Sequence, residues 1–520
     1  MQQESRVKKS LLNARVNLLF YLLTLALSFF SRRIFLDTLG ADFIGLTGTL
    51  YNLLNFLNLA ELGIGSAIGY VLYKPLFEHD QQRINEIISV MGYLYRCIGL
   101  FILVAGSILA CFIPLIFPSS GFELRLIYFA FFSFLASSLI GYFVNYRQNL
   151  LGADQKNYIV TAYFHAWNLL KVIIQIALAL YTGNYYLWVA IELSFGILYS
   201  FILNWKIQKT YPWLKSEASK GRSLFRKYPD VFKYTRQLFV HKIAAFFQYQ
   251  STPFIIYLFI SLKMVAYYGN YSIVCERLAA IVRNLLDSTY AGVGNLIAEG
   301  NTERIKNTFW KLLTARFLTA AICAYCLFTL LPPLICLWLG SEYVLPRSIL
   351  FLVVCNVFLD LLRGTTDQFI YGYGLFYDVW APLTEAAIFL VTAIIGGYLW
   401  GLQGILLGSI VSKVIIVYIW KSYFLFSKGF HLSTLQFWPK WFFFLLLFMA
   451  ASLFARFLSG FTSLESASST SWWYLTIYAF FSFFAFSAVY YALLLTFSKD
   501  MRAFTSDLVG YATNSLRKQS

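Results

Sequence analysis

Charged residues are scarce in this sequence: Asp, Glu, Lys and Arg fill only 12% of its 520 positions, whereas soluble domains carry roughly 25%. A large soluble core is therefore excluded. Hydrophobic residues account for 59%, and they form successive runs of membrane-spanning length with little soluble sequence between them. The first run, from Leu11 to about Leu39, is too long for a cleavable signal peptide and lacks a small-residue cleavage site, so we expect it to be the first membrane helix.

Motifs for catalysis, nucleotide binding and metal binding are also missing. No Gly-Lys dipeptide occurs, which excludes a Walker A loop. None of the histidines has a partner at metal-ligand spacing; they are His79, His165, His241 and His431. The predicted external loops are too short for the acidic pair or the domain that a membrane glycosyltransferase or polysaccharide polymerase uses. The sequence thus predicts no catalytic residues, no metal and no cofactor, and it favours a transporter over an enzyme.

Cysteine shows no pattern that indicates disulfides. All seven cysteines fall within apolar runs, where thiols pack as small hydrophobic groups. Cys323 and Cys326 form a C-x-x-C, but it lies in an uninterrupted apolar stretch without a second ligand pair. Packing is the favoured interpretation, with a redox or metal role as the alternative.

Apolar stretches of about 20 residues predict an all-α polytopic protein with about fourteen membrane helices. They begin near Leu11, Asp42, Ile84, Glu123, Tyr158, Tyr185, Arg236, Met264, Lys306, Arg347, Asp378, Leu402, Trp441 and Trp472. Lysine and arginine concentrate before the first helix and in alternate loops, and cytoplasmic loops carry such an excess. We therefore expect both termini on the cytoplasmic side of the membrane.

The net charge of +17 comes mainly from these loops, so nucleic acid is not an expected partner. The longest basic stretch runs from Lys206 to Arg236 and contains interleaved aromatic residues. That composition is typical of a segment that lies on anionic lipid headgroups.

Two polar segments suggest an internal repeat. Asp80-Gln81-Gln82-Arg83-Ile84 and Asn301-Thr302-Glu303-Arg304-Ile305 follow predicted helices at equivalent positions, although short polar loops also resemble one another by chance. We predict an N-terminal lobe of six helices, a basic linker, a C-terminal lobe of six helices, two further helices and a cytoplasmic tail. Their ranges are 1–208, 209–235, 236–426, 427–498 and 499–520.

Polar residues inside the first predicted helix form one stripe. A charge within lipid costs about 2.5–3.5 kcal/mol on insertion scales, so such residues should face a protein interior or a water-filled path. Arg33 has Asp37 four residues ahead as a partner, whereas Arg32 has no acid at that spacing and is the better anion-binding candidate. The alternative is that both arginines extend to the outer interface. The stripe comprises Asn13, Asn17, Tyr21, Thr24, Ser28 and Arg32.

Three further segments carry polar rows, and together they predict a wet, cationic cavity suited to phosphate. In the segment from Arg347, either Arg363 neutralises its two acids or those acids titrate in a cavity. The rows are Asn52, Asn55, Asn58 and Glu61; Asn270, Arg277, Asn284, Ser288 and Asn295 with Glu276, Arg283 and Asp287 beside them; and Asn356, Asp360, Arg363 and Asp367. The predicted substrate-binding residues are Asn17, Arg32, Arg33, Glu61, Arg277, Arg283 and Arg363.

Without a nucleotide site, uphill transport must draw on an ion gradient or on removal of the product outside. Glu61 has no basic residue within one helical turn in sequence, whereas Asp360 and Asp367 both flank Arg363. All three are candidate ion-coupling residues. Glu61 is the better proton carrier, and the two aspartates are the better structural pair.

The stretch from Ser31, SRRIFLDTLGADFIGLTGTLYNLLNFLNLAELGIGSAI, with LYKPLFEHDQQRI after it, resembles the opening of Wzx-type polysaccharide flippases of the multidrug/oligosaccharidyl-lipid/polysaccharide exporter superfamily. The resemblance implies two six-helix lobes in a V that opens alternately to each side, plus two extra C-terminal helices. It also implies that Arg32 and Arg33 match charged cavity residues. By analogy with the peptidoglycan-precursor flippase, the last two helices would offer a groove for a lipid tail.

The implied cargo is an undecaprenyl-pyrophosphate-linked oligosaccharide for O-antigen, capsule or other lipopolysaccharide and polysaccharide assembly. Expected partners are this lipid-linked oligosaccharide, the membrane, and polysaccharide polymerases and glycosyltransferases, and we expect a monomer. A multidrug or small-solute antiporter of the same fold is the first alternative, although its cargo would favour an acidic pocket. A membrane polymerase or glycosyltransferase is the second alternative.

Overall fold

The computed structural model is all-helical, as predicted. It describes residues 6–61, 64–118, 121–154, 156–229, 231, 251–287, 293, 296–297, 299–375, 378 and 380–507. Among these residues, 10 helices are long and apolar enough to cross a membrane, and no strand occurs. The chain is divided into two compact units, Met1–Ala266 and Tyr267–Ser520.

The first two predicted spans are the two arms of one kinked helix. Helix α1 covers Arg6–Leu57 and breaks at Gly40, with φ 82° and ψ 159°. Only glycine adopts a positive φ of this kind readily. Four predicted starts coincide with the first residue of a helix (Tyr185, Arg347, Leu402 and Trp472), and the start at Arg236 lies outside the described residues.

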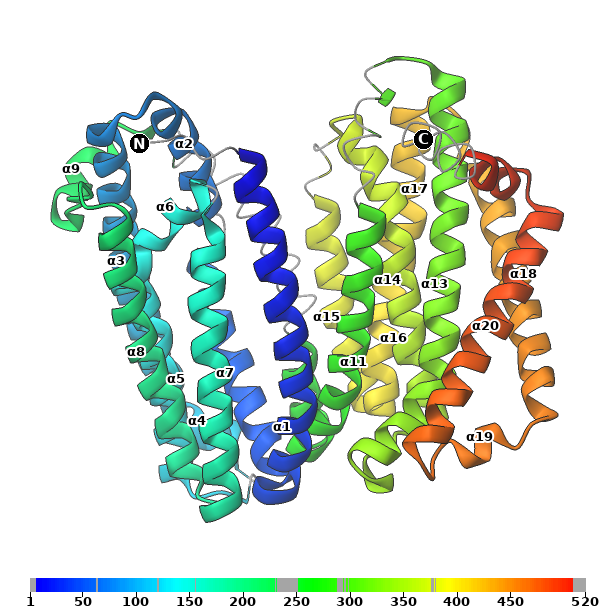
Figure 1. Ribbon diagram of the computed structural model, residues 1–520, viewed down its shortest axis with the longest axis horizontal. Coiled ribbons are helices and arrows are strands. Elements are labelled where there is room, and N and C mark those ends of the chain that lie inside the picture. Colours follow the sequence, from blue (N-terminus) through cyan, green and yellow to red (C-terminus); the bar gives the residue numbers. More distant parts are fainter. Residues whose placement is uncertain are drawn as a thin grey trace. The chain divides into compact units, whose positions relative to one another are not determined.

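Unit 1 is a bundle of long helices. Helix α1 packs against α7, whereas α5 packs against α3 and α8, and Figure 1 shows these helices running side by side in blue to green. The elements after α1 are η1 (Asn58–Glu61), α2 (Ile64–Glu78), α3 (Gln81–Cys111), α4 (Ile113–Ile116), α5 (Leu124–Phe143), η2 (Asn145–Arg147), α6 (Gln148–Ala153), α7 (Asn157–Thr182) and α8 (Tyr185–Thr210).

The described part of the basic linker is folded onto unit 1. Its short helices η3 (Ala218–Lys220) and α9 (Gly221–Phe225) pack against α3. Glu86 on α3 accepts hydrogen bonds of 2.6 Å from Lys227 Nζ and from the Tyr228 hydroxyl. Tyr211 donates to Asp154 at 2.7 Å, and burial together with this carboxylate raises the pKa of Tyr211. Contact of the linker with lipid headgroups stays a prediction.

The two members of the proposed repeat begin long helices in the same way. The Asp80 side chain accepts a hydrogen bond from the backbone N–H of Arg83 at the start of α3, at 2.9 Å. The Asn301 side chain accepts from the N–H of Arg304 at the start of α13, at 3.0 Å. A residue with positive φ precedes each cap, His79 in one case and Gly300 in the other. Asp and Asn are common N-cap residues at helix starts in general, so the repeat stays a prediction.

Unit 2 contains most of α11 (Leu262–Asp287), from Tyr267 onward, and a further set of long helices. Helices α18 and α20 pack against α13 and against each other, as the orange and red ribbons in Figure 1 show. The elements after α11 are α13 (Thr302–Trp338), η4 (Ser341–Tyr343), α14 (Arg347–Gly372), α15 (Trp380–Trp400), α16 (Leu402–Lys413), η5 (Val414–Trp420), α17 (Lys421–Phe424), η6 (Leu425–Gly429), η7 (Thr434–Gln436), α18 (Phe437–Gly460), α19 (Leu464–Ala467) and α20 (Trp472–Phe497).

Gly404→Ala is expected to destabilise unit 2 strongly, because a Cβ at Gly404 would overlap the backbone of Gly396 where α15 and α16 meet. Small residues permit such close helix contacts in membranes. Gly141→Ala is the matched control, since nothing lies within 4 Å of its Cβ position. Thermal unfolding in detergent should show a large fall in midpoint for the first variant and little change for the second. Equal midpoints would contradict this account of the α15–α16 contact.

Candidate functional site

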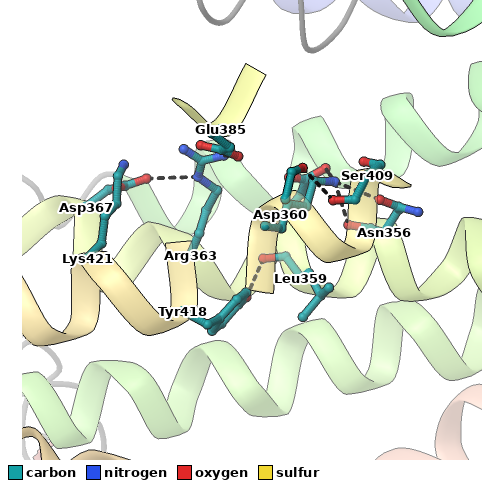
Figure 2. A network of polar contacts seen from close by, with 11 residues as sticks. Asn356, Leu359, Asp360, Arg363, Asp367, Glu385, Ser409, Tyr418 and Lys421 are labelled. Atoms are coloured by element: carbon teal, nitrogen blue, oxygen red, sulfur yellow. Dashed lines mark hydrogen bonds and ion pairs between the residues drawn. The ribbon is translucent and has the colours of Figure 1, made fainter. Parts of the chain in front are cut away.

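The predicted polar row on α14 forms the centre of an ionic network in unit 2 (Figure 2). Asn356, Asp360, Arg363 and Asp367 recur along one side of this helix, as the sequence predicted. Their partners come from α15, α16 and α17, which pack nearby. The network therefore joins four helical segments that are separate in sequence.

Asp360 is paired with Lys413, the last residue of α16. The Lys413 ammonium lies 2.9 Å from Asp360 Oδ2 and 3.0 Å from Asn356 Oδ1, and the lysine side chain is only 5% exposed. The second carboxylate oxygen, Asp360 Oδ1, is buried without a hydrogen-bond partner in the described structure. Burying a charge costs free energy unless the charge is paired. Lys413 therefore provides most of the electrostatic stabilisation of the Asp360 carboxylate.

Arg363 is paired with Asp367 and Glu385. Its Nε lies 3.1 Å from Asp367 Oδ2, and its Nη1 lies 3.7 Å from Glu385 Oε1 on α15. Lys421 on α17 adds a second cation 2.7 Å from Asp367 Oδ1. The interpretation that Arg363 neutralises both aspartates of α14 is therefore right for Asp367, whereas the ion pair of Asp360 is with Lys413.

The helix that supplies Lys413 and Lys421 is π-helical between them. Segment η5 covers Val414–Trp420, and the Tyr418 hydroxyl within it donates to the Leu359 carbonyl of α14 at 2.6 Å. A π turn closes i to i+5 and holds more residues than an α turn, so it shifts the side-chain register. A pattern based on 3.6 residues per turn therefore misplaces these side chains.

Arg316 on α13 is a further buried cation next to the network. It is 2% exposed, and its Nη1 donates to the Leu361 carbonyl at 3.2 Å. A side chain at Gly364 would collide with this guanidinium, so the glycine makes room for it.

Just beyond α14, burial raises the pKa of the Asp378 carboxyl above its ordinary value.

Glu61 in unit 1 is held by two tyrosines. Tyr95 on α3 donates to its Oε1 at 2.5 Å and Tyr142 on α5 donates to its Oε2 at 2.9 Å. The Tyr142 hydroxyl also lies 3.1 Å from Asn58 Oδ1, which accepts from it. No described Lys or Arg lies within ion-pairing distance of this carboxylate, in agreement with the sequence interpretation.

The arginines of α1 lie in different surroundings. Arg32 is half-buried, and its Nη2 donates to the Ala266 carbonyl at 3.0 Å. Arg33 pairs with Asp37 at 3.7 Å, as predicted, and both side chains are more than half exposed, so this pair contributes little to stability. The side chain of Asn17 lies outside the described residues.

The predicted site residues are divided between the two units. Arg277 and Arg283 lie on α11, and both are half-buried. In unit 1, a pair that sequence reasoning missed joins Lys171 on α7 to Glu192 on α8 at 2.6 Å. Each of its members is a solitary charge in an apolar run, which is the signal that would have indicated them.

Comparisons with known proteins identify the fold of the chain but not its family. No protein-family model matches the chain, and no curated protein matches it. Among solved structures, "Lipid II flippase MurJ, inward closed conformation" is similar with TM-score 0.62 and 16% identity, covering 93% of this chain and 100% of that one. An inward-facing multidrug resistance MATE family transporter of the MOP superfamily is similar with TM-score 0.57 and 14% identity, covering 78% of this chain and 96% of that one. The chain is thus a multi-pass membrane protein that shares its fold with these transporters.

Proposed function

We propose that this chain is a flippase that moves a polyprenyl-pyrophosphate-linked oligosaccharide from the cytoplasmic to the outer leaflet by alternating access, for O-antigen, capsule or exopolysaccharide assembly. The observation that carries the proposal is the ionic network enclosed by the apolar helices of unit 2. Charges at such positions are costly and mark transport pathways in membrane proteins.

The sign of the network favours an anionic cargo. Its cations are Arg316, Arg363, Lys413 and Lys421, and its acids are Asp360, Asp367 and Glu385. These are four cations against three acids, and the further carboxyl beside Lys421, that of Asp378, is disfavoured in its charged form by burial, which raises its pKa. A positive electrostatic potential attracts phosphate and repels the cationic compounds that a multidrug exporter carries.

The structural similarities support a lipid-linked cargo in particular. The similarity to the lipid II flippase extends over 93% of this chain, whereas the similarity to the multidrug transporter covers 78%. The multidrug similarity still favours an antiporter as the second candidate function. Proteoliposomes that contain a labelled polyprenyl-pyrophosphate oligosaccharide distinguish the two: a flippase exposes the label to an outside enzyme, whereas an antiporter leaves it protected.

Arg32→Ala is expected to abolish flipping in this assay, because we assign pyrophosphate binding to its guanidinium. Arg32→Lys should restore activity only in part, since an ammonium lacks the bidentate fork. Arg32→Gln keeps a polar amide but is two bonds shorter and carries no charge, so it should fail like Ala. Lys74→Ala is the control, because Lys74 is exposed and paired only with Glu78. Normal flipping by a stably expressed Arg32→Ala protein would remove this residue from the site.

A further inference from the structure

A large apolar crevice lies within unit 2, apart from the ionic network. Its volume is about 1120 Å³, and it is bounded by α13, α14, α18 and α20 with residues of α16 and η5. This is somewhat more than the roughly 300–1,000 Å³ of small-molecule sites. Most of its lining is aliphatic or aromatic, with Phe328, Phe358 and Phe448 among the side chains.

The crevice opens towards the surroundings of unit 2. Three of its apolar lining residues are more than half exposed: Phe351 at 56%, Met449 at 51% and Leu453 at 72%. They lie on helices long and apolar enough to cross a membrane. A lipid of the surrounding bilayer therefore reaches the crevice directly from the side.

One end of the crevice is cationic. Arg347, the first residue of α14, lies 3.2 Å from Glu465 on α19, the short helix that connects α18 and α20 in Figure 1. Arg456 lines the same cavity and forms no ion pair with a described residue. Two guanidinium groups beside one carboxylate leave a net positive charge, and guanidinium binds phosphate with paired hydrogen bonds.

We propose that this crevice holds an anionic phospholipid of the bilayer, of the phosphatidylglycerol type. Its acyl chains occupy the apolar crevice, and its phosphate binds between Arg347 and Arg456. Binding displaces Glu465 from Arg347, so that carboxylate competes with the lipid. The site is separate from the Arg32 cargo site and does not depend on the proposed function. The tail of the cargo, which is the occupant that the family resemblance implies for this groove, would reach it by the same lateral opening, and the experiment below distinguishes the two lipids.

Native mass spectrometry of the detergent-solubilised protein with added phosphatidylglycerol tests the site. The double variant Arg347→Ala/Arg456→Ala is expected to retain about tenfold less of this lipid, with a smaller loss of phosphatidylcholine, whose choline cation offsets its phosphate charge. Glu465→Gln should retain several times more phosphatidylglycerol than the wild type, because the competing charge is gone. Arg222→Ala is the control, since Arg222 is an exposed arginine of α9 in unit 1.

A purely structural role for Arg347 predicts the opposite for Glu465→Gln: loss of the ion pair would lower retention or leave it unchanged, and that result overturns the proposal. Co-purified polyprenyl phosphate in place of phospholipid would also overturn it, in favour of the cargo tail. Ser452→Trp, which fills the crevice at a lining position, should lower retention without touching either arginine. Equal retention by this variant and the wild type would place the lipid elsewhere.

Discussion

Lys413→Met is expected to destabilise the protein by about 3–5 kcal/mol, the typical cost of removing one partner from a buried ion pair. Lys413 is the only described cation in ion-pairing contact with Asp360, at 2.9 Å, and Asp360 Oδ1 already lacks a hydrogen-bond partner among the described residues. Methionine has a similar shape but leaves the carboxylate buried and uncompensated. Denaturant or thermal unfolding in detergent measures the loss.

The double variant Lys413→Met/Asp360→Asn separates charge from packing. With the acid neutralised, most of the lost stability should return, because the penalty comes from the unpaired carboxylate. Lys74→Met is the control, since an exposed pair such as Lys74–Glu78 contributes about 0–1 kcal/mol. If the single and double variants have the same unfolding midpoint, then Lys413 stabilises the protein through packing and not through its charge.

The helical fold and many helix ends follow from the sequence, because both depend on local features. Apolar runs of membrane-spanning length identify α8 and α20 directly, and polar residues with glycines indicate where helices end. The break at Gly40 coincides with the predicted boundary for the same reason. The start of α3 was predicted too far along the chain, at Ile84 instead of Gln81. Hydropathy cannot distinguish a polar helical turn from a loop.

The row of polar residues on α14 was predictable because it repeats at helical spacing. The partners of this row were not, since Lys413, Glu385 and Arg316 come from other helices. The π-helical stretch Val414–Trp420 makes the problem harder, because it rotates Lys421 out of the α-helical register. A single charge within an apolar run, such as Lys413, still indicates a buried partner even when its identity is hidden.

Glu61→Gln is expected to abolish the response of flipping to a pH gradient while the protein remains folded. The two phenol hydroxyls of Tyr95 and Tyr142 donate to the carboxylate, and a hydroxyl can also accept. The glutamine amide therefore keeps both contacts, with its oxygen accepting from one tyrosine and its nitrogen donating to the other. What the substitution removes is the proton that a carboxyl group can take up and release. We expect the flipping rate under an imposed pH gradient to fall by at least about tenfold.

Asp367→Asn is the comparison variant for this experiment, because it also neutralises a carboxylate but one with a different role. Asp367 pairs with Lys421 and is one of the two acids paired with Arg363, so its neutralisation leaves buried positive charge uncompensated and should chiefly lower the amount of folded protein. Glu61 has tyrosines and no described cation as neighbours, so its neutralisation should leave the amount of protein unchanged and alter only the coupling. Proteoliposomes with equal amounts of each protein, assayed with and without a pH gradient, separate these effects. If wild type and Glu61→Gln respond equally to the gradient, Glu61 is not the coupling residue, and its two tyrosine contacts serve only to hold η1 against α3 and α5.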